Sequence, residues 1–83
     1  MDVVTFRFEQ LSDECKRELR REAIRLFPKY DTIDRIETLF KTQYRSVDIR
    51  RVYNTAPSQS YIIADRIITM PKDKYVEFCL RWL

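Results

Sequence analysis

The chain has 83 residues, of which 45% are hydrophobic and 35% charged, and its formal net charge is +3. This length allows a single domain, residues 1–83, and the hydrophobic content excludes a disordered segment. The sequence contains no histidine and only two cysteines, whereas zinc sites need about four nitrogen or sulfur ligands and nucleophilic catalysis usually needs an imidazole base. Phosphate-binding and dinucleotide-binding motifs are absent as well. We therefore expect a non-enzymatic protein with no metal, no cofactor and no small-molecule substrate.

The compartment is inferred from what the sequence lacks. No apolar signal run precedes a small-residue cleavage site, and the apolar runs are too short to span a membrane. We expect an intracellular protein, in the cytoplasm or the nucleus, that does not bind a membrane. Cys15 and Cys79 lie on predicted apolar helical faces and are expected as buried free thiols; a disulfide joining the two ends of the domain is the alternative.

The absence of glycine decides the expected fold class. Glycine normally supplies the positive-φ residues of tight hairpins and helix C-caps. A chain without glycine, but with several capped amphipathic segments, is built more easily from helices than from a sheet. The sequence therefore predicts an all-α fold, a small orthogonal bundle of four to five short helices with an N-terminal extended arm.

Residues 1–8 form the predicted arm. Val4, Phe6 and Phe8 recur at every second position, which is the period of a half-buried strand. Three interpretations remain open: an extended arm that packs its aromatic rings on the bundle, a strand completed by a partner or a second copy, or the first turn of a helix.

A first helix is predicted between Ser12, a favourable N-cap, and Pro28, which ends it. Its apolar residues repeat at helical spacing and are Cys15, Leu19, Ala23, Leu26 and Phe27. The opposite face is basic and carries Lys16, Arg17, Arg20, Arg21 and Arg25. Two glutamates lie among these arginines at spacings that allow ion pairs within the helix.

Residues 32–54 are predicted to form two helices joined by a tight polar turn. The first has an apolar stripe with a helical repeat. Ser46 then serves as the N-cap of a shorter second helix, whose apolar side includes Ile49 and Tyr53.

Two further helices are predicted in the remaining chain. The segment 58–70 is expected to be the most buried helix, and its run of isoleucines leaves a strand as the alternative. Pro71 precedes a last helix, whose residues on one face are Tyr75, Phe78, Cys79 and Trp82. This aromatic face is either part of the core or an exposed surface for a partner.

The order of the segments RLFPKY, TLF, SVDIRRVYN and APSQSYIIADRI partly resembles the helical peptide-binding domain at the C-terminus of poly(A)-binding proteins. The resemblance covers about the middle half of the chain. The Met-Leu-Leu-Glu signature of that family is replaced by Thr38, Leu39, Phe40 and Lys41, and its glycine is missing. The size and the number of helices also resemble death-fold adaptor domains, by fold analogy. Both resemblances imply a helical interaction domain, and we assign the chain to neither family.

The basic charge is concentrated in the predicted first three helices. Residues 16–51 hold 11 basic and six acidic residues, whereas the rest of the chain holds five basic and seven acidic residues. We expect a module that binds a protein partner or a second copy of itself through aromatic residues, while a basic face attracts an acidic partner. The candidate partner-binding residues are Phe6, Phe8, Arg17, Arg20, Arg21, Arg25, Tyr75, Phe78 and Trp82.

The alternative is a small helix-turn-helix protein that binds nucleic acid, with residues 46–54 as its recognition helix. Its candidate contact residues are Lys41, Arg45, Arg50 and Arg51. The interleaved acidic residues and the modest net charge weigh against this alternative.

Overall fold

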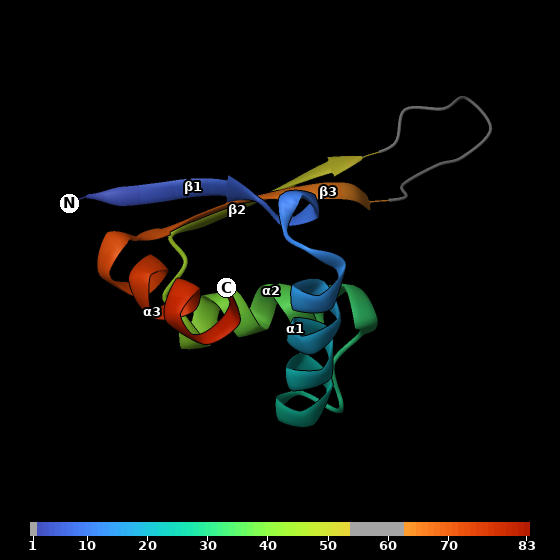
Figure 1. Ribbon diagram of the computed structural model, residues 1–83. Helices are drawn as coiled ribbons and strands as arrows, with labels where there is room; N and C mark the ends of the chain where they lie inside the picture. Colours follow the sequence, from blue (N-terminus) through green and yellow to red (C-terminus); the bar gives the residue numbers. More distant parts are fainter. Residues whose placement is uncertain (1, 54–62) are drawn as a thin grey trace.

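The computed structural model describes residues 2–53 and 63–83. They form a three-stranded antiparallel sheet with three α-helices on one of its faces (Figure 1). In chain order the elements are strand β1 (Val3–Arg7), the 3-10 helix η1 (Phe8–Gln10), helices α1 (Asp13–Leu26) and α2 (Thr32–Gln43), strands β2 (Asp48–Tyr53) and β3 (Ile63–Pro71), and helix α3 (Lys72–Trp82). The expected all-α bundle is therefore wrong, because the described residues combine helices with a sheet.

Three of the predicted helices are confirmed as α1, α2 and α3. α1 begins where the sequence indicates, because the Ser12 hydroxyl accepts a hydrogen bond from the backbone N–H of Cys15 at 3.1 Å. Asp13 and Glu14 place negative charge in its first turn, which the helix dipole favours. Pro28 follows α1 and cannot continue it, because proline has no backbone N–H to donate.

The other two predicted helices are wrong. Residues 48–53 form β2, in which Ile49 is half-buried and Arg50 is exposed, as expected when side chains alternate between the faces of a strand. Residues 63–71 form β3, as the isoleucine-rich alternative indicated. The predicted loop after residue 53 and the start of the predicted fourth helix fall on residues 54–62, outside the described residues. The two strands also contradict the helical domains that the sequence resembles.

The predicted N-terminal arm is strand β1, and its partner is strand β3 of the same chain. The segment is extended and its aromatic rings pack on the core, as expected of the arm, but it is a strand of the sheet and not a separate arm. The strand alternative is confirmed in its secondary structure, whereas its completion by a partner or a second copy is wrong, because β3 supplies the pairing. The helical turn is wrong for Val3–Arg7. Phe6 lies in β1, and Phe8 begins the 3-10 helix that follows.

The sheet has the order β1-β3-β2, so the last strand of the chain is the central one. Ile68 and Met70 of β3 are fully buried against the helices, and Ile68 lies opposite Phe6. On the other face, which we call the outer face, Thr69 lies opposite Thr5 and the two hydroxyls are 2.9 Å apart. The outer face is not covered by α1, α2 or α3 (Figure 1).

One hydrophobic core joins the sheet to all three α-helices. Its largest fully buried side chains are Phe8, Leu19, Leu39, Phe40, Ile68, Met70 and Phe78. Cys15 belongs to this core and Cys79 packs against it, and both are free thiols, so the disulfide alternative is wrong. Burial raises the pKa of the Cys15 thiol, which keeps it protonated and unreactive at neutral pH.

Arg45 occupies a backbone conformation that glycine normally provides. Its φ is 49°, in the left-handed region, where it turns the chain from α2 into β2. The backbone N–H of Ser46 then donates to the carbonyl of Phe40 at 3.1 Å. A chain without glycine thus closes a helix with a residue whose Cβ disfavours that conformation.

We expect Arg45→Gly to raise the free energy of unfolding by about 1 kcal/mol, because the unfavourable Cβ contact costs more than the added flexibility of glycine. Urea denaturation followed by circular dichroism measures the change as a higher midpoint with the same slope. Arg45→Ala is the matched control, because it removes the same side chain and keeps the Cβ. A glycine variant no more stable than the alanine variant would contradict this account.

Candidate interaction groove

The aromatic residues predicted to bind a partner are placed in or against the core. Phe8 and Phe78 are fully buried, and Phe6, Tyr75 and Trp82 pack against the core while remaining partly exposed. The rings of Phe6 and Phe78 are stacked with their centroids 5.5 Å apart. The indole N–H of Trp82 donates to the Tyr44 hydroxyl at 2.6 Å. These side chains are therefore used to hold α3 against the sheet and α2.

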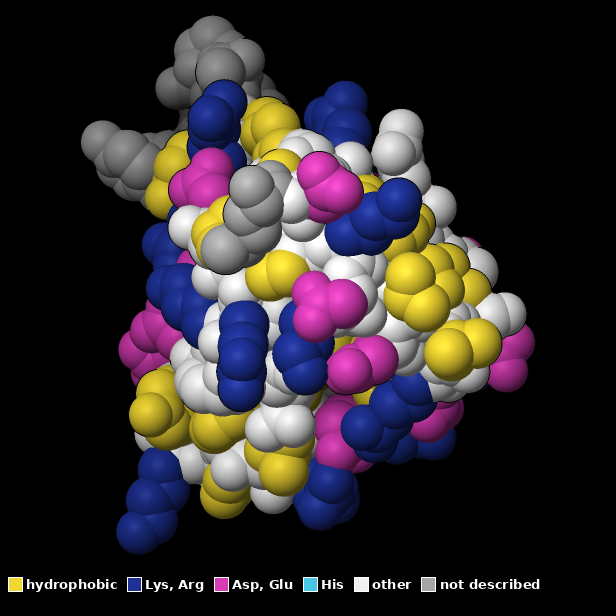
Figure 2. Space-filling view, turned by 90° about the vertical axis from the view of Figure 1, so that its left-hand side faces the viewer, with side chains coloured by type: hydrophobic (Ala, Val, Ile, Leu, Met, Phe, Trp, Pro, Cys, Tyr) yellow, Lys and Arg dark blue, Asp and Glu magenta, His cyan; other side chains and the backbone are white. Residues whose placement is uncertain are grey.

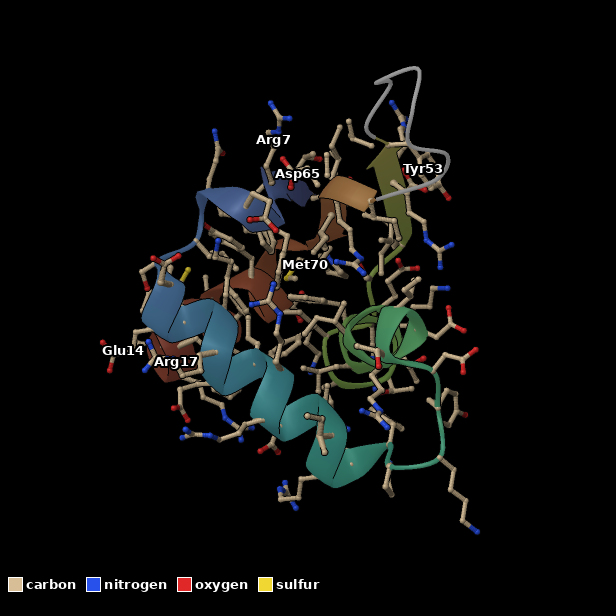
Figure 3. The ribbon with its side chains drawn as sticks, turned by 90° about the vertical axis from the view of Figure 1, so that its right-hand side faces the viewer. Arg7, Glu14, Arg17, Tyr53, Asp65 and Met70 are labelled. Carbon is tan, nitrogen blue, oxygen red and sulfur yellow. The ribbon has the colours of Figure 1, made fainter. Side chains whose placement is uncertain are left out.

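An open groove lies between α1, α2 and the start of β3. It has a volume of about 470 Å³, and its walls include Arg20 and Ile24 of α1, Ile33 and Arg35 of α2, and Ile63 and Arg66 of β3. Figure 3 shows this side of the molecule, with α1 and α2 diverging below β3. The groove therefore brings together residues from three elements that are far apart in the sequence.

The apolar part of the groove is unusually accessible. Ile24 and Ile33 are 51% and 48% exposed, whereas Ala23 and Ile36 form a buried base beneath them. A β-branched side chain gains little from a half-exposed position, because about half of its surface stays in contact with water. The two isoleucines thus provide apolar surface that a binding partner can bury.

Arg20 provides a positive charge on the α1 side of the groove. Its guanidinium lies over the ring of Phe8, 5.6 Å from the centroid, and Arg66 lies 5.9 Å from the same ring. This cation–π contact orients the Arg20 side chain without neutralising it. Arg20 forms no ion pair with a described carboxylate.

Arg35 provides a second positive charge on the α2 side. Its Nε donates to the carbonyl of Phe27 at 3.1 Å, and its Nη2 donates to the carbonyl of Pro28 at 3.0 Å. These neutral acceptors lie at the C-terminal end of α1, where the helix dipole favours a cation. Arg35 therefore fixes α2 against α1 and keeps its net charge.

The third guanidinium of the groove, that of Arg66, is neutralised by an ion pair with Glu37 of α2. Glu37 is only 6% exposed and accepts a hydrogen bond from Arg66 Nε at 2.9 Å. It also accepts two bonds from Arg51, from Nε at 2.8 Å and from Nη2 at 3.0 Å. Burial alone would raise the pKa of Glu37, but the hydrogen bonds from the two arginines lower it below its usual value. Arg51 bonds Asp34 as well, at 3.1 Å.

The groove as a whole is positively charged. Its one acidic wall residue, Glu9, is paired with Lys16 at 2.9 Å. Residue 1 and residues 54–62 contain no Asp or Glu, so they cannot supply a carboxylate to Arg20 or Arg35. An anionic partner could thus approach two guanidinium groups without breaking an existing ion pair.

The other predicted arginines of α1 lie outside the groove. Arg21 pairs with Glu18 at 2.9 Å, and Arg25 pairs with Glu22. Arg17 forms no ion pair with a described carboxylate and is labelled near the start of α1 in Figure 3. Of the four arginines predicted to attract a partner, the groove includes one, Arg20.

The residues predicted to contact nucleic acid do not share one helical face. Lys41 and Arg45 are exposed on α2 and just after it, whereas Arg50 and Arg51 lie on opposite faces of β2. Arg51 is bound to Glu37, and Arg50 lies 3.9 Å from Asp48. On the face shown in Figure 2, basic and acidic side chains are interspersed and form no single basic patch.

Comparisons with protein-family models, with curated protein sequences and with solved structures give no match to this chain. Across residues 2–53 and 63–83, no cluster of histidine, cysteine, aspartate and glutamate is suited to hold a metal ion. Within the same residues, no helix has both the length and the apolar character needed to cross a membrane.

Proposed function

We propose that this chain is a non-enzymatic interaction module whose groove between α1 and α2 binds a protein segment that carries apolar side chains next to carboxylates. The observation that supports this function is the arrangement of Arg20 and Arg35 around the exposed Ile24 and Ile33. Both guanidinium groups lack a carboxylate partner, and both isoleucines offer surface that water now covers.

The two parts of the groove contribute different energies. Covering the exposed halves of the isoleucines contributes about 1 kcal/mol for each side chain. A carboxylate that meets Arg20 can form two parallel hydrogen bonds, because a guanidinium presents its donors in a planar fork. A groove of about 470 Å³ accommodates a few side chains rather than a whole domain. We therefore expect weak binding, with a Kd on the order of 10–100 µM.

A fluorescein-labelled pool of short peptides rich in Glu and Leu is the probe that tests this function, with a pool rich in Lys and Leu as the reference. Fluorescence anisotropy at physiological salt is expected to show binding of the acidic pool only. Arg20→Ala is expected to weaken binding about tenfold, which corresponds to one lost charged contact.

Arg17→Ala is the matched control for this experiment. Arg17 lies on the same helix and lacks an ion pair in the described structure, but it does not line the groove. We expect its loss to change the affinity less than twofold. Equal effects of the two substitutions would indicate general attraction to the basic helix, and equal binding of both pools would contradict the proposed function.

A second candidate function is nucleic-acid binding through α1 and α2. Only residues 27–31 separate these helices, which run in clearly different directions (Figure 1), as in a helix-turn-helix. α2 would then take the role of the second helix, with Lys41 and Arg45 near phosphates. Anisotropy with a labelled duplex separates the two candidates, because here Lys41→Ala and Arg45→Ala should weaken binding and Ile33→Ser should not.

A further inference from the structure

The two edges of the sheet are not equivalent, and the edge formed by β1 has free hydrogen-bonding groups. The backbone N–H of Lys72 donates to the carbonyl of Asp2 at 3.0 Å, so Asp2 directs its backbone groups toward β3. Along an antiparallel strand, successive residues direct their backbone N–H and C=O groups alternately toward one neighbouring strand and toward the other side. Since Asp2 faces β3, every second residue after it faces β3 as well, and the residues between them face away from the sheet. These outward residues are Val3, Thr5 and Arg7, and no described strand pairs with them.

The edge formed by β2 carries features that oppose pairing with another strand. Three of its six residues are charged, and two of these, Asp48 and Arg50, lie on the outer face. The register shifts between Val52 and Tyr53, as in a β-bulge, which bends the strand locally. Edge charges and bulges are common means by which proteins prevent their sheets from associating.

The edge formed by β1 lacks these features. Val3 is 47% exposed, and neither lysine, proline nor a bulge interrupts the strand. The single charged residue, Arg7, turns back over the sheet, where its Nε donates to a carboxylate oxygen of Asp65 at 2.7 Å. Figure 3 shows these two side chains next to each other. Because Arg7 is paired with Asp65, its charge does not oppose the association of another strand with β1.

We infer that two copies of this chain pair through β1 in antiparallel orientation and form one continuous six-stranded sheet. The outward backbone groups fix the register, because they can bond only to outward groups of the second copy. Pairing all three outward residues places Thr5 opposite Thr5 of the second copy, and Val3 opposite Arg7. Each opposite pair then exchanges two backbone hydrogen bonds.

The side chains of β1 are self-complementary in this register. On the helix-facing side, Val4 lies opposite Phe6 of the second copy, so the partly exposed apolar layer continues across the interface. On the outer face, Arg7 meets an uncharged valine, and no like charges are opposed. The β1 strand of a second copy is therefore complementary to β1 on both faces of the sheet. This favours a second copy over an unrelated strand as the binding partner of this edge. The groove residues are not on β1, so this inference does not depend on the proposed function.

Sedimentation equilibrium over a range of protein concentrations tests this pairing. The wild-type mass is expected to rise from 10.2 kDa toward twice that value as the concentration increases. Thr5→Lys places two ammonium groups opposite each other at the symmetry axis and is expected to weaken the dimer about fivefold. Thr5→Pro removes an outward N–H that β3 does not use and should have a similar effect.

Thr69→Lys is the matched control, because it breaks the same contact between hydroxyls on the same face but lies on the central strand. It is expected to leave the dimer unchanged, and circular dichroism shows whether each variant is folded. Hydrogen exchange provides a direct readout, because the Thr5 amide should become protected at high protein concentration.

Three results would overturn the inference. The chain could stay monomeric up to about 1 mM, which would leave β1 for an unrelated strand or for none. Thr69→Lys could weaken association as much as Thr5→Lys, which would indicate packing through the outer face. The dimer could also persist in both Thr5 variants, which would place the interface elsewhere.

Discussion

Phe78→Ala is expected to lower the free energy of unfolding by about 3–5 kcal/mol. Phe78 is fully buried at the centre of an aromatic cluster, with ring centroids 5.5 Å from Phe6, 5.7 Å from Phe40 and 5.4 Å from Tyr44. Removing the ring leaves a cavity that the surrounding rings cannot fill without leaving their own contacts. The loss is a large fraction of the stability of a small domain.

Urea denaturation followed by circular dichroism and by Trp82 fluorescence measures this loss. Leu80→Ala is the matched control, because Leu80 lies on the same helix and is 83% exposed. We expect the control to change stability by less than about 0.5 kcal/mol. A Phe78→Ala variant as stable as the control would show that the cluster does not hold α3. Until its folding is established, loss of partner binding in this variant cannot be assigned to a surface contact.

The second large effect is expected for Glu37→Ala, again about 3–5 kcal/mol, because it leaves the largely buried guanidinium of Arg66 without its carboxylate partner. The side chain of Arg66 is only 12% exposed, and its Nε bonds to Glu37. Arg51 loses both of its bonds to the same carboxylate and keeps its bond to Asp34. The affected residues join α2, β2 and β3, so the sheet should separate from α2 when the carboxylate is removed.

The free energy of unfolding, measured as a function of pH, distinguishes the charge of Glu37 from the packing of its side chain. The hydrogen bonds from Arg51 and Arg66 overcome the effect of burial and hold the pKa of Glu37 below its usual value. The unfolded chain therefore binds the proton first, and the stabilisation falls as the pH drops below about 4.5 and through the lower pKa of the folded state. Glu37→Gln keeps the shape and should flatten this pH dependence. An unchanged dependence would mean that Glu37 is not the group that titrates.

Asp65 contributes to the same acid dependence and must be considered beside Glu37. Burial alone would raise the pKa of Asp65, but the backbone N–H groups of Glu9 and Arg66, together with Arg7, lower it. The residual slope expected in Glu37→Gln is assigned to Asp65, and Asp65→Asn tests that assignment. Exposed pairs such as Arg21 with Glu18 contribute little, because water screens them.

Sequence reasoning located α1, α2 and α3 because their signals are local. The Ser12 cap, the apolar repeat of α1 and the two prolines that flank helices act within a few residues of the chain. The sequence does not indicate β2, because its helix-facing positions hold Ile49 and the half-buried Arg51, and a charged residue on that side hides the apolar alternation of a strand. The carboxylates of Glu37 and Asp34, both on α2, explain why an arginine can occupy such a position.

The all-α fold expected from the missing glycine is wrong, because a sheet needs glycine only where its strands are joined by tight hairpin turns. A two-residue hairpin turn does require positive φ, but β2 and β3 are joined by residues 54–62, which is long enough to need no such turn. The one described position that calls for positive φ is occupied by Arg45. The absence of glycine therefore weighs against two-residue hairpin turns but not against a sheet.

The candidate groove could be predicted only in part. Arg20 was recognised from the basic face of its helix, which is a local pattern. Arg35, Arg66 and the two exposed isoleucines were not recognised, because their significance depends on contacts between residues far apart in the chain. The aromatic residues were recognised as important, but a sequence does not separate a core ring from a surface ring when both follow the same spacing.

The central position of β3 determines the order in which this protein can be completed during synthesis. Thr5 and its partner Thr69 are 64 residues apart, and β2 also pairs only with β3. No part of the sheet can therefore form until residues 63–71 have left the ribosome, although α1 and α2 are contiguous and can pack earlier. Until then β1, which includes Phe6, has no pairing strand within its own chain. Such a segment is a natural substrate for chaperones that bind extended apolar peptides, and slow elongation would prolong its exposure.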